Sequence, residues 1–502
     1  MGNLHKNLQT FAAVLIRAAC EFKEKIDKRA LSPDFSTGKE KVPLCMEQYW
    51  RLFKTYREAA SPKDIHITDT HDNLESNEHV VVFCQGQAFV LMTKMGEKLS
   101  QSELMFSLQE VINMAKNRPK SLVTPVGLLT APNRDKATQA LDILKQDETN
   151  KHSLNWIKTS AFILCLDMDC PPLEGSEEDQ LVQQNCDLLH GRNGNEYNRW
   201  FHKSLQFVVC DNGTNGVNIE HSVSEGIVHI QMVENNILPY ITDNVKKNQP
   251  VSPKKFMKPK PLSWYLSTQF RTMIEEIRDD HQKLIKDFQF EVLIFTEYGK
   301  EYPKSKRVSP DCYIQLALQL AIYKDFGYLV STYESASIRR FKEGRVDNIR
   351  AATPEALAWA KLMEDPNANE DDVKQAFDAA SKKQTLIMTE NVTGQGIDNH
   401  LVALRELSKG VNGPPDMFLD RTFAELFRFP LTTSQVSTVT PGTILSYGPV
   451  VHDGYGCAYN LKSDQVWFAI ANYKSCKRTD SGRFKRNLAS SLTEMKTFLD
   501  RF

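Results

Sequence analysis

Short apolar runs typical of buried strands alternate with helical patterns along the whole 502-residue chain. The runs at 160–167 (SAFILCLD), 204–210 (SLQFVVC) and 288–295 (FQFEVLIF) are bounded by polar or turn-forming residues, and each is too short for a typical helix. Residues 8–28 carry apolar side chains at helical spacing, and 310–326 begin with Pro and end before Gly, as helices often do. Because strands and helices alternate along the chain, the pattern predicts α/β domains with mixed sheets.

A chain of this length is expected to form two or three domains, or one domain with two lobes. Residues 246–264 are rich in Lys and Pro and show no periodicity, which is typical of a linker. We therefore predict a first lobe at 1–245, which begins with a helix, and a second lobe at 265–502. A further helix is expected around Val42–Ala59.

Composition excludes several classes of protein. The net charge of −1 gives no reason to expect nucleic acid or a membrane surface as a partner. No apolar run reaches transmembrane length, so membrane insertion is not expected. None of the ten cysteines forms a Cys-x-x-Cys pair, which indicates reduced thiols in a cytoplasmic protein and predicts no metal site. The chain also lacks a P-loop and a Gly-x-Ser-x-Gly elbow, and the latter absence argues against a serine acyl-enzyme.

A predicted β-hairpin at 204–220 places one histidine at the end of a strand. Its turn is Asp211-Asn212-Gly213, and the returning strand leads directly to His221, with Glu225 four residues later. If a helical turn follows, this spacing brings the carboxylate beside the imidazole. A carboxylate on one ring nitrogen fixes the tautomer and leaves the other nitrogen as a general base. A hydrogen-bonded structural histidine is the alternative, and this stretch alone leaves both open.

Three further groups are candidates for binding or catalysis. The basic loop at 299–309 precedes a helix N-terminus and is either a phosphate site or a solvated loop. The hydroxyls at 432–434 can donate to an oxyanion or merely bond to a neighbouring strand. Tyr333, Tyr447 and Tyr455 can surround a quaternary ammonium group or lie in the core.

Six longer segments resemble the choline/carnitine acyltransferase family, and the resemblance covers nearly the whole chain. They are NRWFHKSLQFVV from 198, GTNGVNIEHS from 213, SPDCYIQLALQLAIY from 309, STYESASIRRFKEGRVDNIR from 331, TTSQV from 432 and YGPVVHDGYGCAYN from 447. The resemblance implies two similar α/β lobes with mixed sheets flanked by helices, and an active-site tunnel between them. It also implies acyl transfer with acetyl-CoA as co-substrate and no tightly bound cofactor.

The resemblance assigns roles to individual residues. His221 matches the general base, Glu225 the carboxylate that orients it, and Ser434 the hydroxyl that stabilises the oxyanion. The positions that match coenzyme A contacts or line its side of the site are Lys300, Lys304, Asp311, Gln435 and Arg340. The positions implied for the acceptor are Tyr333, Val346, Asn399, Thr432 and Tyr447.

Two of these positions favour choline over carnitine as the acceptor. Family members that use carnitine hold its carboxylate with the Arg of an Ile-Asp-Arg-His segment, where this chain has Asn399, and place Thr where it has Val346. Without the Arg, a bound carboxylate loses about 1.5–3 kcal/mol of charge-assisted hydrogen bonding. We therefore predict a monomeric enzyme that transfers the acetyl group of acetyl-CoA to choline. A carnitine acyltransferase is one alternative, and a truncated, non-catalytic form is another, because family members begin with a further N-terminal region.

Overall fold

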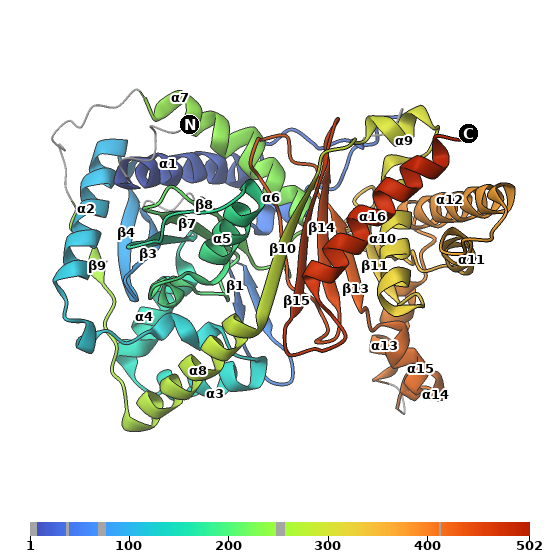
Figure 1. The fold of residues 1–502 in the computed structure, drawn as a ribbon. Coiled ribbons are helices and arrows are strands. Elements are labelled where there is room, and N and C mark those ends of the chain that lie inside the picture. Colours follow the sequence, from blue (N-terminus) through green and yellow to red (C-terminus); the bar gives the residue numbers. More distant parts are fainter. Residues whose placement is uncertain (1–7, 37–39, 69–76, 247–256, 411–412) are drawn as a thin grey trace. The chain divides into compact units, whose positions relative to one another are not determined.

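The computed structural model describes residues 8–36, 40–68, 77–246, 257–410 and 413–502, which form a mixed α/β protein (Figure 1). The chain divides into two compact units. The first consists of Met1–Asp34, Met46–Ser176 and Gln183–Lys286. The second consists of Phe35–Cys45, Glu177–Val182 and Asp287–Phe502. The chain therefore passes between the units more than once.

The first unit is built on a mixed sheet in which the strands lie in the order β5-β4-β3-β6-β7-β8. The strands in chain order are β3 (Asn77–Cys84), β4 (Gln87–Met95), β5 (Glu97–Lys98), β6 (Ile163–Asp167), β7 (Leu205–Cys210) and β8 (Asn215–Ile219). Strands β3, β6 and β7 are parallel, the predicted hairpin β7–β8 is present, and β3 and β4 form a second hairpin. A separate pair consists of β1 (Thr55–Glu58) and β2 (Ile65–Thr68).

Helices cover both faces of this sheet, which explains why its central strands are apolar throughout rather than alternating. One face packs against α1 (Leu8–Asp27) and α2 (Gln101–Asn117). The other packs against α3 (Arg134–Leu144), α4 (Glu148–Thr159) and α8 (Thr268–Asp287). In β7, for example, Phe207 and Val209 face the first layer and Val208 the second.

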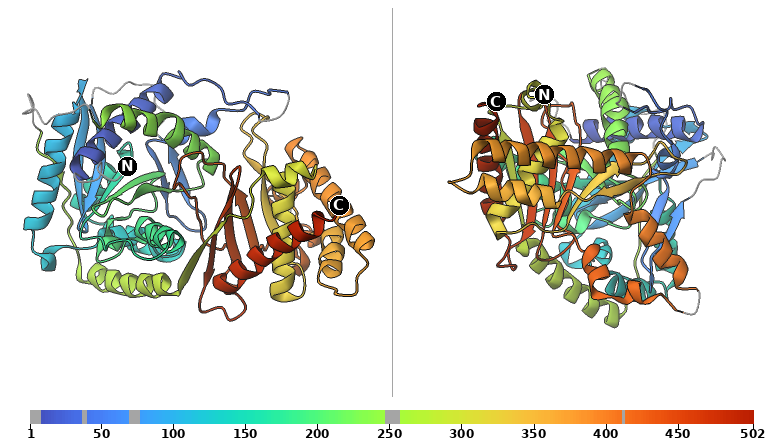
Figure 2. Two further views of the ribbon diagram at one scale, coloured as in Figure 1. Left: turned by 45° about the horizontal axis from the view of Figure 1, so that its top comes forward. Right: turned by 90° about the vertical axis from the view of Figure 1, so that its right-hand side faces the viewer.

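The second unit has its own mixed sheet, in the order β10-β15-β14-β13-β11-β12. Its strands are β10 (Phe288–Phe295), β11 (Thr332–Ser337), β12 (Val346–Ile349), β13 (Leu431–Gln435), β14 (Tyr455–Leu461) and β15 (Val466–Tyr473). Two helices, α10 (Pro310–Phe326) and α16 (Ser481–Leu499), lie side by side (Figure 2) and share one core with a face of the sheet. The remaining helices are α9 (Glu301–Ser305), α11 (Pro354–Met363), α12 (Glu370–Val392), α13 (Asp398–Ser408), α14 (Asp416–Leu419) and α15 (Arg421–Leu426).

The two sheets repeat the same sequence of strand directions. Across the first sheet, from β5 to β8, the pairings of neighbouring strands are antiparallel, antiparallel, parallel, parallel and antiparallel. Across the second, from β10 to β12, they are the same. By this pattern β8 corresponds to β12 and β6 to β13. The prediction of two α/β lobes with mixed sheets flanked by helices is thus confirmed.

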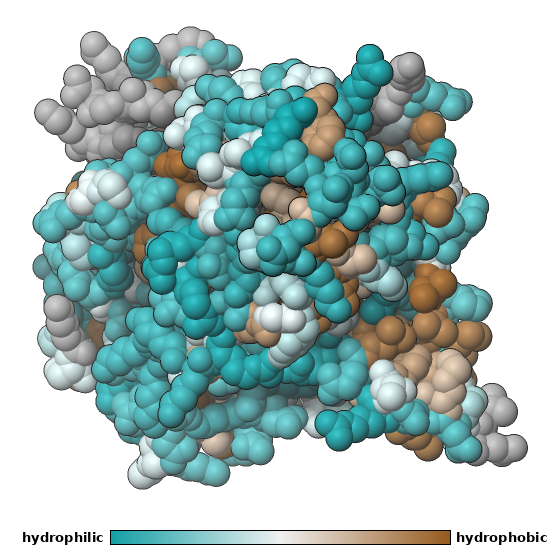
Figure 3. Space-filling view, turned by 45° about the vertical axis from the view of Figure 1, so that its right-hand side comes forward, coloured by the Kyte–Doolittle hydropathy of each residue, from teal (hydrophilic) through white to brown (hydrophobic). Residues whose placement is uncertain are grey.

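Exposed apolar side chains gather on the second unit over α13–α15, where the space-filling view shows a brown area (Figure 3). They include Leu404, Leu407, Met417 and Leu419, of which Leu407 is 74% exposed. Because water already surrounds these side chains, polar replacements here should cost little stability.

The predicted helix at Val42–Ala59 is wrong. The chain instead forms a short 3₁₀ helix, Glu47–Arg51, and then strand β1. Lys54 between them has a positive φ of 54°, which no helix permits. Pairing of β1 with β2, which local sequence does not reveal, decides the conformation.

The predicted boundary between the lobes is also corrected. Much of the predicted linker, 247–256, lies outside the described residues. Beyond it, β9 (Lys260–Pro261) pairs with β4, and Phe270, Ile274 and Ile277 of α8 pack in the first unit's core. The first unit therefore extends to Lys286, because the apolar face of α8 is buried there rather than in the second sheet.

Candidate active site

The hairpin β7–β8 carries His221 out of the first sheet. At its turn, the Cys210 N–H donates to the Thr214 carbonyl at 2.9 Å, and Gly213 adopts a φ of 94°, which favours glycine. The last pairing of the hairpin is the Glu220 N–H donating to the Ser204 carbonyl at 3.1 Å. His221 therefore lies where the chain leaves the sheet, as the sequence predicted.

His221 and Glu225 form a pair in which one member is exposed and the other is buried. The imidazole Nε2 lies 3.6 Å from the Glu225 Oε2, and the two side chains are 70% and 11% exposed. This distance suits an ion pair but is long for a hydrogen bond. A carboxylate held beneath an accessible imidazole suits a base that must reach a substrate.

The predicted helical turn from His221 to Glu225 is absent. Helix α6 (Gly226–Met232) begins only after Glu225, which occupies its N-cap position with extended backbone angles. The preceding residues form a turn in which Val223 and Ser224 are buried. The approach of the two side chains therefore depends on this turn, not on helical spacing.

Two buried residues that sequence reasoning missed, Gln48 and His229, hold the main chain of Glu225, and a third, Ser224, bonds to His229. The Glu225 N–H donates to Gln48 Oε1 at 2.7 Å, and its carbonyl accepts from His229 Nδ1 at 3.2 Å. Since Nδ1 donates there, the other nitrogen of His229 accepts from the Ser224 hydroxyl at 3.3 Å. The four-residue spacing from Glu225 to His229 was a local sequence signal for their contact. For Gln48, which is 177 residues from Glu225, the sequence gives no such signal.

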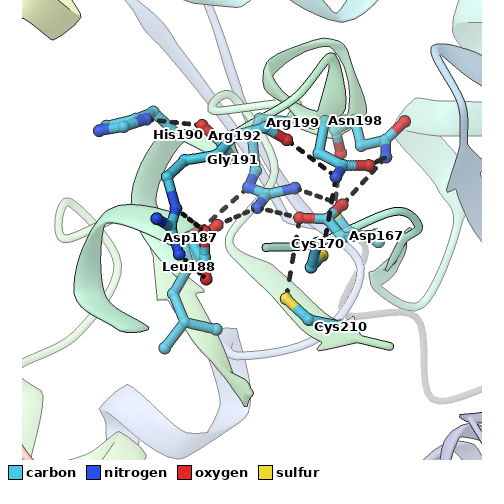
Figure 4. Close-up of polar contacts among 12 residues, drawn as sticks. Asp167, Cys170, Asp187, Leu188, His190, Gly191, Arg192, Asn198, Arg199 and Cys210 are labelled. Atoms are coloured by element: carbon cyan, nitrogen blue, oxygen red, sulfur yellow. Dashed lines mark hydrogen bonds and ion pairs between the residues drawn. The ribbon is translucent and has the colours of Figure 1, made fainter. Parts of the chain in front are cut away.

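A buried ion pair links the end of β6 to the segment that precedes β7 (Figure 4). Arg199 donates to both oxygens of Asp167, at 3.1 and 2.7 Å, and both side chains are 1% exposed. Burial by itself lowers the pKa of Arg199, but the charge of Asp167, its hydrogen bonds and the neighbouring thiols together raise the pKa overall. The same guanidinium donates to the carbonyls of Asp187 and Leu188 at the end of α5 (Glu177–His190). It thus joins β6, α5 and the segment before β7.

The second unit brings together several residues predicted for the acceptor and the oxyanion. Strand β13 runs parallel between β11 and β14, with Thr432 opposite Tyr333 and Ser434 opposite Ala458. The Tyr447 hydroxyl donates to the Thr432 carbonyl at 3.0 Å, and burial raises the pKa of this phenol well above its usual range. Because side chains alternate along a strand, Thr432 and Ser434 lie on one face. His221 and Glu225 belong to the first unit, whereas Ser434 belongs to the second.

Tyr455 does not join Tyr333 and Tyr447. It is fully buried on the face that packs against α10 and α16, where its ring stacks on Phe484 with centroids 4.6 Å apart. Its hydroxyl donates to Asp325 at 2.7 Å. The core alternative is therefore correct for this tyrosine.

The two positions that favour choline in the sequence are in contact. The Asn399 amide donates to the Val346 carbonyl at 2.8 Å, and the Asn399 N–H donates to Asp347 at 3.3 Å. Asp398 beside it binds Arg350 through two hydrogen bonds, at 2.8 and 3.0 Å. The neighbouring guanidinium is therefore already paired with a carboxylate, and position 399 itself carries no charge.

The residues predicted for coenzyme A are spread over three places in the second unit. Lys300 precedes α9 and Lys304 lies within it, paired with Glu301 at 2.8 Å, so the predicted loop is partly helical. Tyr302 packs this turn against Tyr298, with ring centroids 4.7 Å apart. Ser309 is at the N-cap of α10, but its side chain makes no capping hydrogen bond.

Asp311 belongs to a buried polar group on the α10 side of the sheet. The Tyr459 hydroxyl donates to it at 2.5 Å, and Tyr459 is the register partner of Gln435. Burial raises the pKa of Asp311, and burial together with Asp311 raises that of Glu334. Gln435 is exposed at the end of β13, and Arg340 is exposed in the turn after β11.

Among the residues that the structure describes, no group of three or more His, Cys, Asp or Glu is arranged to hold a metal ion. The helices described there include none with the length and apolar character needed to span a bilayer.

The fold and these site segments coincide with a known family of transferases. The family model "Choline/Carnitine o-acyltransferase" matches residues 2–490, so the chain belongs to the choline/carnitine O-acyltransferase family. Choline O-acetyltransferase of Mus musculus is 39% identical over 97% of this chain and 76% of its own length. The choline O-acetyltransferase of Drosophila melanogaster is 35% identical over 97% of this chain and 73% of its own length. Carnitine O-acetyltransferase of Rattus norvegicus is 32% identical over 97% of this chain and 77% of its own length.

Solved structures add little to this result. The wax ester synthase/diacylglycerol acyltransferase of Marinobacter aquaeolei VT8 is 11% identical over 67% of this chain and 80% of its own, with a TM-score of 0.34.

Proposed function

We propose that this chain transfers the acetyl group of acetyl-CoA to the hydroxyl of choline, releasing acetylcholine and coenzyme A. The observation that carries the proposal is the exposed imidazole of His221 beside the buried carboxylate of Glu225. Membership of the acyltransferase family supports the reaction class. The names of the mouse and fly relatives support choline as the acceptor.

In the proposed mechanism His221 acts as the general base. It takes the proton of the choline hydroxyl, and the oxygen attacks the thioester carbonyl directly, without an acyl-enzyme. The Ser434 hydroxyl donates to the oxyanion of the tetrahedral intermediate. The intermediate collapses, the carbon–sulfur bond breaks, and His221 returns its proton to the departing thiolate. Glu225 stabilises the imidazolium that exists between these two transfers.

Lys300 and Lys304 are proposed to contact the phosphates of coenzyme A. Both lie in the segment around α9, and cationic side chains on so short a stretch suit a ligand that carries several negative charges. Asp311, Gln435 and Arg340 are proposed to contribute to the same side of the site. No tightly bound cofactor and no metal enter the mechanism.

The preference for choline rests on Asn399. The side-chain amide of Asn399 donates a hydrogen bond to the Val346 carbonyl, and the residue has no positive charge to pair with the carboxylate of carnitine. Tyr333, Thr432 and Tyr447 are proposed as further acceptor contacts, since an ammonium group favours aromatic faces. A carnitine acyltransferase is the second candidate, favoured by the identity to the rat carnitine enzyme.

The test is acetyl transfer from acetyl-CoA by the purified chain, with choline and with carnitine, and with His221→Ala as control. Turnover with choline that the substitution abolishes supports the proposal. Preference for carnitine contradicts the role of Asn399. A folded wild-type chain without turnover on either acceptor contradicts the proposed activity. Light scattering and fractionation test the accompanying proposals that the protein is monomeric and cytoplasmic.

A further inference from the structure

A buried glutamine from a distant part of the chain fixes the start of α6. The Oε1 of Gln48 accepts the Glu225 N–H at 2.7 Å, and these residues are only 4% and 8% exposed. A buried N–H that loses its acceptor costs about 1–3 kcal/mol, so the contact constrains the backbone here strongly.

Glu225 uses its side chain in an unusual way for its position. An N-cap residue normally accepts hydrogen bonds from the first helical N–H groups through its side chain. At Glu225 no such capping bond is present, and its carboxylate faces His221 instead. Gln48 and His229 hold its main chain, while its carboxylate lies 3.6 Å from the imidazole.

The backbone that carries Gln48 is itself held in the first unit. Tyr49 and Leu52, which follow Gln48 in the chain, are buried in that unit's core. Gln48 therefore presents its oxygen from a chain with little freedom to move.

We propose that Gln48 is a positioning residue for the His221–Glu225 pair, acting through the Glu225 main chain. This inference rests on the proposed function, because it takes His221 as the base. Loss of the Gln48 oxygen frees the Glu225 N–H and lets the turn between His221 and α6 relax. The carboxylate then moves away from the imidazole, although neither partner of the pair has been changed.

The test compares Gln48→Met, Gln48→Glu and Gln87→Met. Met has nearly the size of Gln but offers no oxygen, whereas Glu keeps an oxygen that accepts the N–H. Gln87 is a matched control: it is a buried glutamine of the same unit whose amide donates to the Ala115 carbonyl at 2.9 Å. Each variant is checked by circular dichroism and its unfolding midpoint before kinetics.

For Gln48→Met we expect kcat to fall about tenfold or more, as small displacements of catalytic groups commonly produce, with KM for acetyl-CoA unchanged. Gln48→Glu should retain more activity than Gln48→Met, and Gln87→Met should keep the wild-type kcat. Wild-type kinetics for Gln48→Met, or equal losses in both Met variants, would overturn the inference.

Hydrogen exchange separates this inference from the proposed function. In Gln48→Met, amide exchange at Glu225 should accelerate whether or not the chain has acetyltransferase activity. An inactive wild-type chain with this acceleration contradicts only the proposed function. Unchanged exchange at Glu225 contradicts the positioning contact itself.

Discussion

Replacing Glu225 by Gln removes the negative charge beside His221 while keeping the size of the side chain. At 3.6 Å, two unit charges attract by about 1 kcal/mol in water and by about 5 kcal/mol at an effective dielectric constant near 20. Since the His221 side chain is 70% exposed, the value for water applies more closely. We therefore expect Glu225→Gln to lower kcat about fivefold, because the imidazolium between the proton transfers loses about 1 kcal/mol.

Steady-state acetyl transfer to choline checks this value. His221→Ala should cost far more, about 10²–10⁴-fold, because it removes the base itself. The effect of Glu225→Gln should shrink as salt is added, since exposed charges are screened. Glu78→Gln is the control, because it also removes a carboxylate of the first unit from a cation, Lys23, at 2.6 Å, but away from the site.

Two outcomes would refute the reasoning. If Glu225→Gln is as inactive as His221→Ala, the carboxylate does more than attract a charge through solvent. If it retains full activity, or if Glu78→Gln loses as much kcat, the pair has no electrostatic part in the reaction.

Three further substitutions test other parts of the structure. Asn399→Arg should raise the ratio of carnitine to choline turnover about 10- to 100-fold, since one charge-assisted contact contributes about 1.5–3 kcal/mol; an unchanged ratio of kcat/KM values contradicts the acceptor assignment. Arg199→Met should lower the free energy of unfolding by about 3–5 kcal/mol, because Asp167 then stays buried without its cation. Urea unfolding measures that loss, and a loss below about 1 kcal/mol would show that the pair is dispensable. Burial raises the pKa values of Asp311 and Glu334, so the folded state binds protons more tightly and these groups destabilise it as pH rises above about 4. Glu334→Gln should therefore make the unfolding free energy decrease less steeply as pH rises. An unaltered slope of unfolding free energy against pH contradicts the destabilising role of Glu334.

Local chemistry determined much of the fold. The hairpin β7–β8 follows from two apolar strands around an Asp-Asn-Gly turn, and its prediction was correct because the pairings between these two strands join residues close in sequence. The helix at 8–28 and the strand at 288–295 were likewise predicted nearly to their ends. The position of His221 at the end of a strand follows from the same local signals.

Only the tertiary structure decided features that join distant segments. The stretch 42–59 carries a plausible helical pattern, yet pairing with β2 makes part of it a strand. Helix α8 was expected in the second lobe because the linker precedes it, but its apolar face is buried in the first. A periodic pattern shows that a face must be buried but does not show which partner buries it.

The candidate site divides in the same way. The sequence alone determined the residue types and the four-residue spacing of His221 and Glu225, although a turn rather than a helix brings them together. The contact of Asn399 with Val346 joins positions 53 residues apart, and that of Glu225 with Gln48 joins positions 177 apart. Such contacts form because the folded core brings their backbones together, and a hydrogen bond of a few ångströms leaves no periodicity in the chain. The residues proposed to react are therefore visible in the sequence, whereas the residues that hold them in place are visible only in the fold.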